Sequence, residues 1–194
     1  MMLVESLASR DGVLENLVYH NRRFNEARKK LFGALDYIDL ADIVRPQKEG
    51  LLKCRVLYNT AVHDVTYEVY TRRTITSLRL VESESIEYAY KFADRRALEA
   101  LFARRNGADD VLIVKNGLIT DSYAANIAAY DGKHWYTPAV PLLQGTRRQA
   151  LLDARLIIPR DISVEDLAQY KTVSIINCMI GLGELKIPVG KIYT

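Results

Sequence analysis

The stretch KNGLITDSYAANIAAYDGKHWYTP, residues 115–138, decides how the second half of the chain folds. Its apolar runs are separated by Asn-Gly and Asp-Gly pairs at 116–117 and 131–132, which are typical of tight hairpin turns. The run LIT ends in a carboxylate, Asp121, which the small residues of SYAAN follow at once. An acid that closes an apolar strand is either solvated or placed to meet a cation. Because Asp is seldom buried, the pattern alone favours solvent.

Upstream of this stretch, the strongest helical pattern covers residues 20–32, with Gly33 as its C-cap, and a weaker one covers 35–44. One face of the stronger helix is apolar and consists of Phe24, Ala27, Leu31 and Phe32. Residues 51–86 instead alternate between polar residues and Val, Tyr or Leu, which predicts two or three antiparallel strands. The N-terminal part therefore has an α/β texture.

Downstream, a helix is predicted to begin at Lys91 and to close at Gly107, and a second covers residues 146–156. A short helix over 163–170 precedes a buried strand over 172–179. The texture changes near residues 83–90. We therefore expect an α+β protein with a small α/β domain over residues 1–86, a mixed-sheet domain over 87–194, and a cleft between them.

The composition narrows the functional class. The chain has 194 residues and a formal charge of +3, and its basic residues are scattered, which argues against nucleic acid as a partner. The longest uncharged apolar stretch, residues 173–183, is too short to span a bilayer, and because of the charges near the N-terminus we expect no signal peptide. Cys54 and Cys178 lie in apolar runs without metal-ligand spacing. Free, buried thiols and a cytoplasmic location follow as expectations.

Several residues could perform chemistry, and each also has a plain structural reading. Lys91 could be a desolvated amine that attacks carbonyls, or a surface lysine. Gly145 and Thr146 precede a helix, where free backbone N–H groups bind phosphate or simply form a cap. Arg22 and Arg23 could bind an anion, or could form the polar face of their helix.

Other constellations are missing from the sequence. The three histidines, His20, His63 and His134, are isolated, so no zinc site is expected. There is no GxSxG elbow, no Walker loop and no GxGxxG motif, which disfavours ordinary hydrolases and nucleotide-binding folds.

Taken in order, the segments YHNRRF, YKFADR, KNGLITDSYAANI, WYTP, LLQGTRRQALL and IINCMI resemble the class IV aminotransferases. This pyridoxal-phosphate family holds branched-chain and D-amino acid aminotransferases and aminodeoxychorismate lyase. The resemblance covers nearly the whole chain, and the AAN run after the acid is most similar to the lyases. It implies a two-lobed fold with the cofactor, pyridoxal 5′-phosphate, in the cleft.

The resemblance also implies cofactor roles for individual residues. Lys91 stands at the place of the catalytic Schiff-base lysine, and Arg23 at that of the arginine that binds the phosphate. Thr146 and Arg147 match the donors that hold the same phosphate. Asp121 matches the acid under the ring, which keeps the pyridine nitrogen protonated so that the ring draws electrons. The family usually has Glu at this position, so the carboxylate here is one methylene shorter.

The remaining implied residues lie around the cofactor or the substrate. Asn126, Asn177 and Cys178 match positions that flank the cofactor. An amino substrate that carries two carboxylates suggests arginines on the wall of the cleft. Arg55 and Tyr58 are candidate substrate residues, with Arg72 and Arg73 as further candidates, and each could equally be a surface residue at a strand edge.

Three functions stay open at this point. The resemblance favours a lyase that eliminates pyruvate from aminodeoxychorismate to give para-aminobenzoate. An aminotransferase for D-amino or branched-chain amino acids would use the same residues, and a non-catalytic module could retain the fold. By the resemblance we expect this chain to lack the family's opening strands, which leaves the substrate side of the cleft least defined. By resemblance the protein is expected to be a homodimer.

Overall fold

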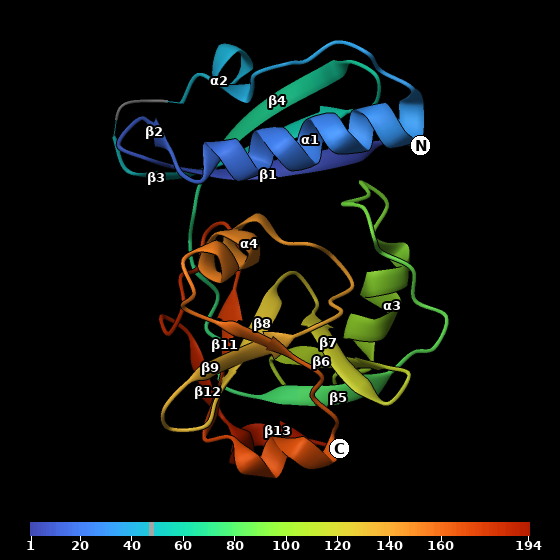
Figure 1. Ribbon diagram of the computed structural model, residues 1–194, viewed down its shortest axis with the longest axis vertical. Coiled ribbons are helices and arrows are strands. Elements are labelled where there is room, and N and C mark those ends of the chain that lie inside the picture. The colour runs from blue at the N-terminus through green and yellow to red at the C-terminus, as the bar shows by residue number, and fades with distance from the viewer. Residues whose placement is uncertain (47–48) are drawn as a thin grey trace. The chain divides into compact units, whose positions relative to one another are not determined.

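The computed structural model describes residues 1–46 and 49–194, which fold as two compact units (Figure 1). The first unit comprises Met1–Arg72 and Tyr90–Asp94, and the second comprises Arg73–Ala89 and Arg95–Thr194. Each unit is built on its own β-sheet, with few helices. The predicted mixed α and β fold is confirmed.

The described residues of the first unit form a four-stranded sheet in the order β2-β1-β3-β4. Its strands are β1 (Leu3–Arg10), β2 (Val13–Leu14), β3 (Leu51–Tyr58) and β4 (Val62–Val69), and every neighbouring pair is antiparallel. Two helices follow β2, α1 (Leu17–Phe32) and the short α2 (Leu40–Ile43). Alternate side chains of β3 are buried, as the alternating sequence predicts.

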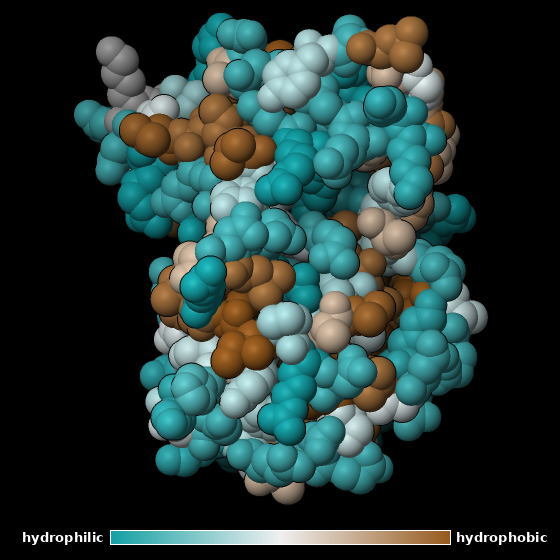
Figure 2. All heavy atoms as spheres, viewed as in Figure 1, coloured by the Kyte–Doolittle hydropathy of each residue, from teal (hydrophilic) through white to brown (hydrophobic). Residues whose placement is uncertain are grey.

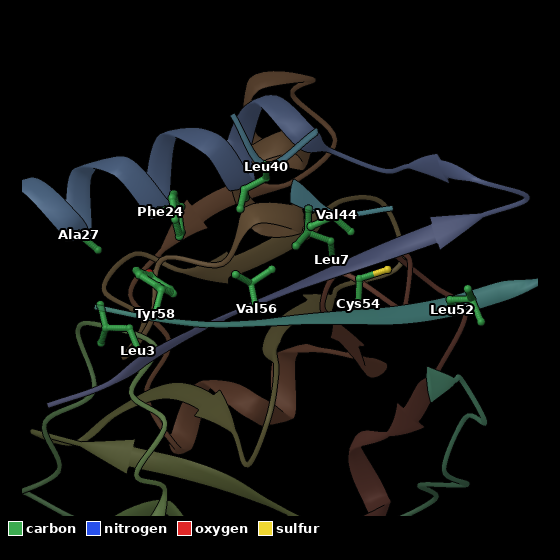
Figure 3. Packing of buried hydrophobic residues seen from close by; sticks show 10 residues of the cluster. All are labelled: Leu3, Leu7, Phe24, Ala27, Leu40, Val44, Leu52, Cys54, Val56 and Tyr58. Atoms are coloured by element: carbon green, nitrogen blue, oxygen red, sulfur yellow. The ribbon is translucent and has the colours of Figure 1, made fainter. Parts of the chain in front are cut away.

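The core of the first unit lies between the sheet and α1 (Figure 3). Phe24 and Ala27 of α1 point toward side chains of β1 and β3, among them Leu3, Leu7 and Val56. These α1 residues belong to the apolar face that the sequence predicts. Helix α1 ends at Phe32, and Gly33 is its C-cap, in the left-handed conformation (φ 69°) that glycine adopts readily.

The second unit contains a nine-stranded sheet among the described residues, with the path β10-β9-β8-β7-β6-β5-β13 and with β11 and β12 attached through β8. Its strands are β5 (Leu78–Glu82), β6 (Asp110–Lys115), β7 (Leu118–Ser122), β8 (Asn126–Tyr130), β9 (Trp135–Pro138), β10 (Ile158–Arg160), β11 (Thr172–Ile176), β12 (Lys186–Pro188) and β13 (Ile192–Tyr193). The turn between β6 and β7 uses left-handed Asn116 and Gly117, as the Asn-Gly pair predicts.

The second unit also contains helices α3 (Arg96–Ala103) and α4 (Thr146–Asp153) and 3₁₀ turns over Glu165–Gln169 and Val189–Lys191. The helix predicted over 163–170 is the first of these 3₁₀ turns. The weak helix predicted over 35–44 is reduced to the four residues of α2, because the described chain is irregular before Leu40.

Two predictions about the middle of the chain are wrong. Strand β5 does not pair with β3 or β4, because it hydrogen-bonds to β6 in parallel within the second sheet. Lys91 does not begin a helix, since α3 begins at Arg96 and Lys91 lies in an irregular segment whose backbone is bound to β1. The units therefore divide differently from the predicted 1–86 and 87–194, with residues 73–89 in the second unit and 90–94 in the first.

The surface is mostly hydrophilic in the view of Figure 2, with apolar residues gathered around α4 of the second unit. Leu156 and Ile158, which follow that helix, are among the exposed large apolar side chains. Among the described residues, no helix is both long and apolar enough to cross a membrane. Both cysteines are free, but only Cys54 is buried, whereas the expected burial of Cys178 is incomplete.

Candidate functional site

A buried ionic cluster lies between β1 and α1 in the first unit. Glu5 of β1 points toward α1, where His20 and Arg23 stand one turn apart on the same face. Nδ1 of His20 lies 2.6 Å from Oε1 of Glu5, and Nη2 of Arg23 donates to the same oxygen at 2.5 Å. Nε of Arg23 donates to Oε2 at 3.3 Å, which completes a two-point contact. Arg23 is thus held by both oxygens of one carboxylate.

The charges of this cluster are set by burial and by proximity. Burial alone would raise the pKa of Glu5, but the charge of Arg23 and the contact with His20 outweigh it and lower that pKa to about 2. Burial lowers the pKa of His20, against the opposing effect of Glu5. The cluster at neutral pH therefore consists of an anionic Glu5, a cationic Arg23 and a neutral His20. The Arg23 side chain keeps 19% of its surface exposed.

Lys91 lies in the segment Tyr90–Asp94 of the same unit and is half-buried. The carbonyl of Lys91 accepts a hydrogen bond from the N–H of Val4 at 2.9 Å, and Phe92 forms a bridge with Leu3. The charge of Lys91 contributes to lowering the pKa of His20, so the amine acts on the ionic cluster. Lys91 is thus neither fully exposed nor fully buried, and its role stays a prediction.

In the second unit, Asp121 is 5% exposed and is enclosed by a closed set of hydrogen bonds. Asn126, directly opposite on β8, donates from Nδ2 to Oδ1 of Asp121 at 2.8 Å. The N–H of Leu143 donates to Oδ2 of Asp121 at 2.9 Å, and Nδ2 of Asn126 also donates to the carbonyl of Leu143 at 2.8 Å. The acid at the end of the apolar strand is therefore buried, and the solvated position that the pattern favours is incorrect.

Burial raises the pKa of Asp121 to about 7, although Leu143, Asn126 and the guanidinium of Arg148 each act to lower it. Arg148 is itself buried, and its Nη2 donates to the carbonyl of Pro138 at 2.8 Å. A carboxylate that is this strongly desolvated gains stability from any cation that reaches it. A pyridinium nitrogen is such a cation.

Helix α4 of the second unit begins beside the same loop. Gly145 is its N-cap, with no side-chain capping hydrogen bond, and Thr146 is buried at its first turn. Nε and Nη2 of Arg147 approach the carbonyls of Asn177 and Cys178 at 3.4 and 3.2 Å. The structure thus brings Arg147 together with two of the predicted flanking residues, at a helix N-terminus that favours anions.

The buried acid Asp121 and the start of helix α4 fit pyridoxal phosphate in chemical terms. The second unit by itself supplies a buried acid for a ring cation and a helix N-terminus for a phosphate. Among residues 1–46 and 49–194, no group of His, Cys, Asp or Glu residues is placed to hold a metal ion.

The predicted substrate residues are not brought together. Tyr58 is 1% exposed and packs in the core against Phe24, with ring centroids 4.4 Å apart. Arg55 lies three positions earlier on β3, so that it projects from the opposite face of the sheet. Tyr58 is a core residue because its position continues the buried alternation of the strand. A shared substrate subsite of Arg55 and Tyr58 is therefore contradicted.

The other candidate arginines have local partners. Arg22 is exposed over the ring of Tyr19, and Arg73 lies over the ring of Phe102 and donates to the carbonyl of Asp109. Arg72 is exposed. None of these observations gathers them around one ligand.

Sequence reasoning missed Glu5, His20 and Arg148. The spacing of His20 and Arg23 on one helical face was the available signal for the first cluster. Nothing in the sequence distinguishes buried Glu5 from an exposed residue of a strand, because both faces of β1 are buried. Arg148 follows Arg147 in an apparently polar helix start, and only the fold separates the two environments.

The fold, the buried acid Asp121 and the start of helix α4 together point to one class of protein. The family model for class IV amino-transferases matches residues 55–186. The chain belongs to this family, whose membership supports a pyridoxal-phosphate-dependent enzyme.

Individual relatives agree with this assignment. An uncharacterized protein of Haemophilus influenzae is 34% identical over 185 residues, which are 93% of this chain and 98% of that protein. A crystal structure from Haemophilus somnus 129PT, provisionally named a 4-amino-4-deoxychorismate lyase, has a TM-score of 0.88 at 33% identity and covers 93% of this chain and 97% of its own. A hypothetical aminotransferase from Mycobacterium tuberculosis in its PLP-bound form shares the fold, with a TM-score of 0.77 at 20% identity over 98% and 81% of the two chains.

Proposed function

We propose that the protein is a pyridoxal-phosphate-dependent lyase that eliminates pyruvate from aminodeoxychorismate and leaves para-aminobenzoate. The single observation that carries the cofactor assignment is buried Asp121, whose pKa is raised to about 7 beside the start of helix α4. Support for the lyase activity comes from the Haemophilus somnus protein of that provisional name, with which the chain is 33% identical over nearly its whole length.

In this proposal the residues have separate tasks. Lys91 supplies the amine that holds the cofactor aldehyde and, once released, moves protons as general acid and base. Arg23 and the start of α4, with Thr146 and Arg147, bind the phosphate. Asp121 holds a proton at the pyridine nitrogen, and the bound cofactor then supplies an electron sink for the substrate carbon.

The rest of the assigned site orients these groups. Asn126, Asn177 and Cys178 belong to the cofactor surroundings, and Asn126 contacts Asp121 directly. When Lys91 has removed a proton from the substrate, loss of pyruvate turns the substrate's non-aromatic ring into an aromatic one, which drives the reaction forward. The shorter acid, Asp in place of Glu, is compatible with this role because its carboxylate is held by two donors from the same unit.

An aminotransferase is the second candidate. It is favoured by the shared fold of the PLP-bound Mycobacterium tuberculosis protein, which is a hypothetical aminotransferase. The same residues would serve, but Lys91 would return the proton to the cofactor carbon, and the product would be a keto acid. A non-catalytic module that retains the fold is the third candidate.

The experiment supplies the purified protein with pyridoxal phosphate and aminodeoxychorismate, and measures pyruvate and para-aminobenzoate. The lyase forms both in equal amounts, and Lys91→Ala forms neither. Pairs of amino acids and keto acids are supplied in a second assay. Amino-group exchange without pyruvate release selects the aminotransferase, and inactivity in both assays of a protein that takes up no cofactor selects the module.

We further propose a homodimer that acts in the cytoplasm on a small amino substrate carrying carboxylates. Tyr58 has no place in the proposed substrate site, because it is a core residue. Arg55 is retained as a candidate because it is half-buried on the outward face of β3. Size measurement in solution tests the dimer, and the KM of Arg55→Ala tests the substrate contact.

A further inference from the structure

Asn126 occupies an unusual position between the buried acid and helix α4. Its Nδ2 donates at 2.8 Å both to Oδ1 of Asp121 and to the carbonyl of Leu143. Because an amide nitrogen has two hydrogens, these two bonds use its full donor capacity. The N–H of Leu143 returns a bond to Oδ2 of Asp121 at 2.9 Å. The three residues therefore form a closed ring of hydrogen bonds.

The other end of the Asn126 side chain faces Gly145, the N-cap of α4. A Cβ atom built on Gly145 would lie 1.8 Å from Oδ1 and 3.0 Å from Cγ of Asn126, well inside van der Waals contact. The next nearest atom, Cβ of Arg148, would lie at an ordinary 3.7 Å. The backbone of Gly145 has φ −73°, which any L-residue adopts. Glycine is needed here because of Asn126 alone.

We propose that Asn126 is a positioning residue that locks the carboxylate of Asp121 to the N-terminal turn of helix α4. The lock holds the group that meets a cation and the group that meets an anion as one rigid piece. This inference rests on the proposed function only for the purpose of the lock. That purpose is to match the distance between the ring nitrogen and the phosphate group of one cofactor molecule. The lock itself is a property of the protein without cofactor.

The geometry predicts a clash and its rescue in the cofactor-free protein. Gly145→Ala should lower the melting temperature by several degrees, because its new methyl group overlaps Oδ1 of Asn126. Asn126→Ala should also lower it, because two buried hydrogen bonds are lost. In the double variant the clash is gone, so Gly145→Ala should add no further loss on the Asn126→Ala background. Gly190→Ala is the matched control, since its Cβ would meet nothing within 4 Å.

A second readout separates positioning from mere stability. The N–H groups of Asn126 are among those that lower the pKa of Asp121. Asn126→Ala should therefore raise the pKa of Asp121. A ¹³C NMR titration of the cofactor-free protein measures this pKa. Gln149→Ala, which removes an exposed side-chain bond on α4, should leave that titration unchanged. An unchanged titration of Asp121 in Asn126→Ala would overturn the proposal. So would a Gly145→Ala variant whose melting temperature equals that of Gly190→Ala.

The affinity for pyridoxal phosphate tests whether the lock serves cofactor binding. Pyridoxal phosphate should bind Asn126→Ala at least about tenfold more weakly than wild type, since misplaced groups lose about 1.4 kcal/mol or more of binding. Additive losses in the double variant, or wild-type affinity in Asn126→Ala, would contradict the lock. If the wild-type protein takes up no pyridoxal phosphate while the clash, the rescue and the titration behave as expected, the lock stands and the proposed function fails.

Discussion

Arg23 donates hydrogen bonds to both carboxylate oxygens of buried Glu5, from Nη2 to Oε1 at 2.5 Å and from Nε to Oε2 at 3.3 Å. Glu5→Gln leaves the charge of Arg23 without its counterion in a largely buried place. We expect a loss of about 3 kcal/mol in the free energy of unfolding at pH 7. Chemical denaturation measures it. Glu15→Gln, which breaks the exposed pair with Arg10, is the control and should cost less than about 1 kcal/mol.

The same pair predicts a pH dependence. The pKa of Glu5 is about 2 in the folded protein and 4.5 ordinarily, so the folded state binds fewer protons in that range. Its stabilisation is complete above pH 4.5 and is lost as the pH falls toward 2. In Glu5→Gln the free energy of unfolding should depend less on pH between pH 2 and 5. Denaturation at several pH values in that range measures this dependence. Equal slopes in wild type and variant would contradict the charge assignment.

Asp121 should change the free energy of unfolding with pH in the opposite direction, and at higher pH. Its pKa is about 7 in the folded protein and 3.8 ordinarily, so the folded state without cofactor holds the proton more tightly. This contribution to stability is full below pH 3.8 and declines by roughly 4 kcal/mol as the pH rises through 7. The difference in unfolding free energy between wild type and Asp121→Asn should therefore change across pH 4 to 7. Asp64→Asn on exposed β4 is the matched control, and a constant difference would sink the prediction.

Tyr58 distinguishes a core residue from a substrate residue. Its ring lies against Phe24, and burial raises the pKa of its hydroxyl. Tyr58→Phe keeps the ring and should cost less than about 1.5 kcal/mol of stability, whereas Tyr58→Ala leaves a cavity and should cost about 3–5 kcal/mol. Thermal and chemical denaturation give both values. If Tyr58→Phe instead left stability intact and raised KM strongly, Tyr58 would be a substrate residue after all.

Local patterns predicted much of the fold. The apolar face of α1, the alternation of β3 and the Asn-Gly turn at 116–117 are properties of neighbouring residues, and each appears in the structure. The partner of β5 could not be predicted in this way. Alternation identifies a strand but not the sheet that it joins, and β5 pairs with β6. The sequence predicts a helix at Lys91 because helical residues follow it, but the Lys91 carbonyl is hydrogen-bonded to Val4 of β1.

The site was predictable only where a family motif marked it. Asp121 and Asn126 stand in one motif, and the structure joins them by a hydrogen bond. Residue type alone suggested a solvated Asp121, because burial depends on the loop around Leu143, which is distant in sequence. Glu5 carried no motif, and its meeting with His20 and Arg23 depends on how α1 packs against β1.

We propose that one lysine, Lys91, bonds covalently to pyridoxal phosphate. The direct measurement mixes the protein with the cofactor, reduces with borohydride and locates the added mass by peptide mass spectrometry. We expect a single label on Lys91, unchanged in the control variant Lys53→Ala and missing from folded Lys91→Ala. A protein that takes up no label, or one that is labelled equally when Lys91 is replaced, would contradict it.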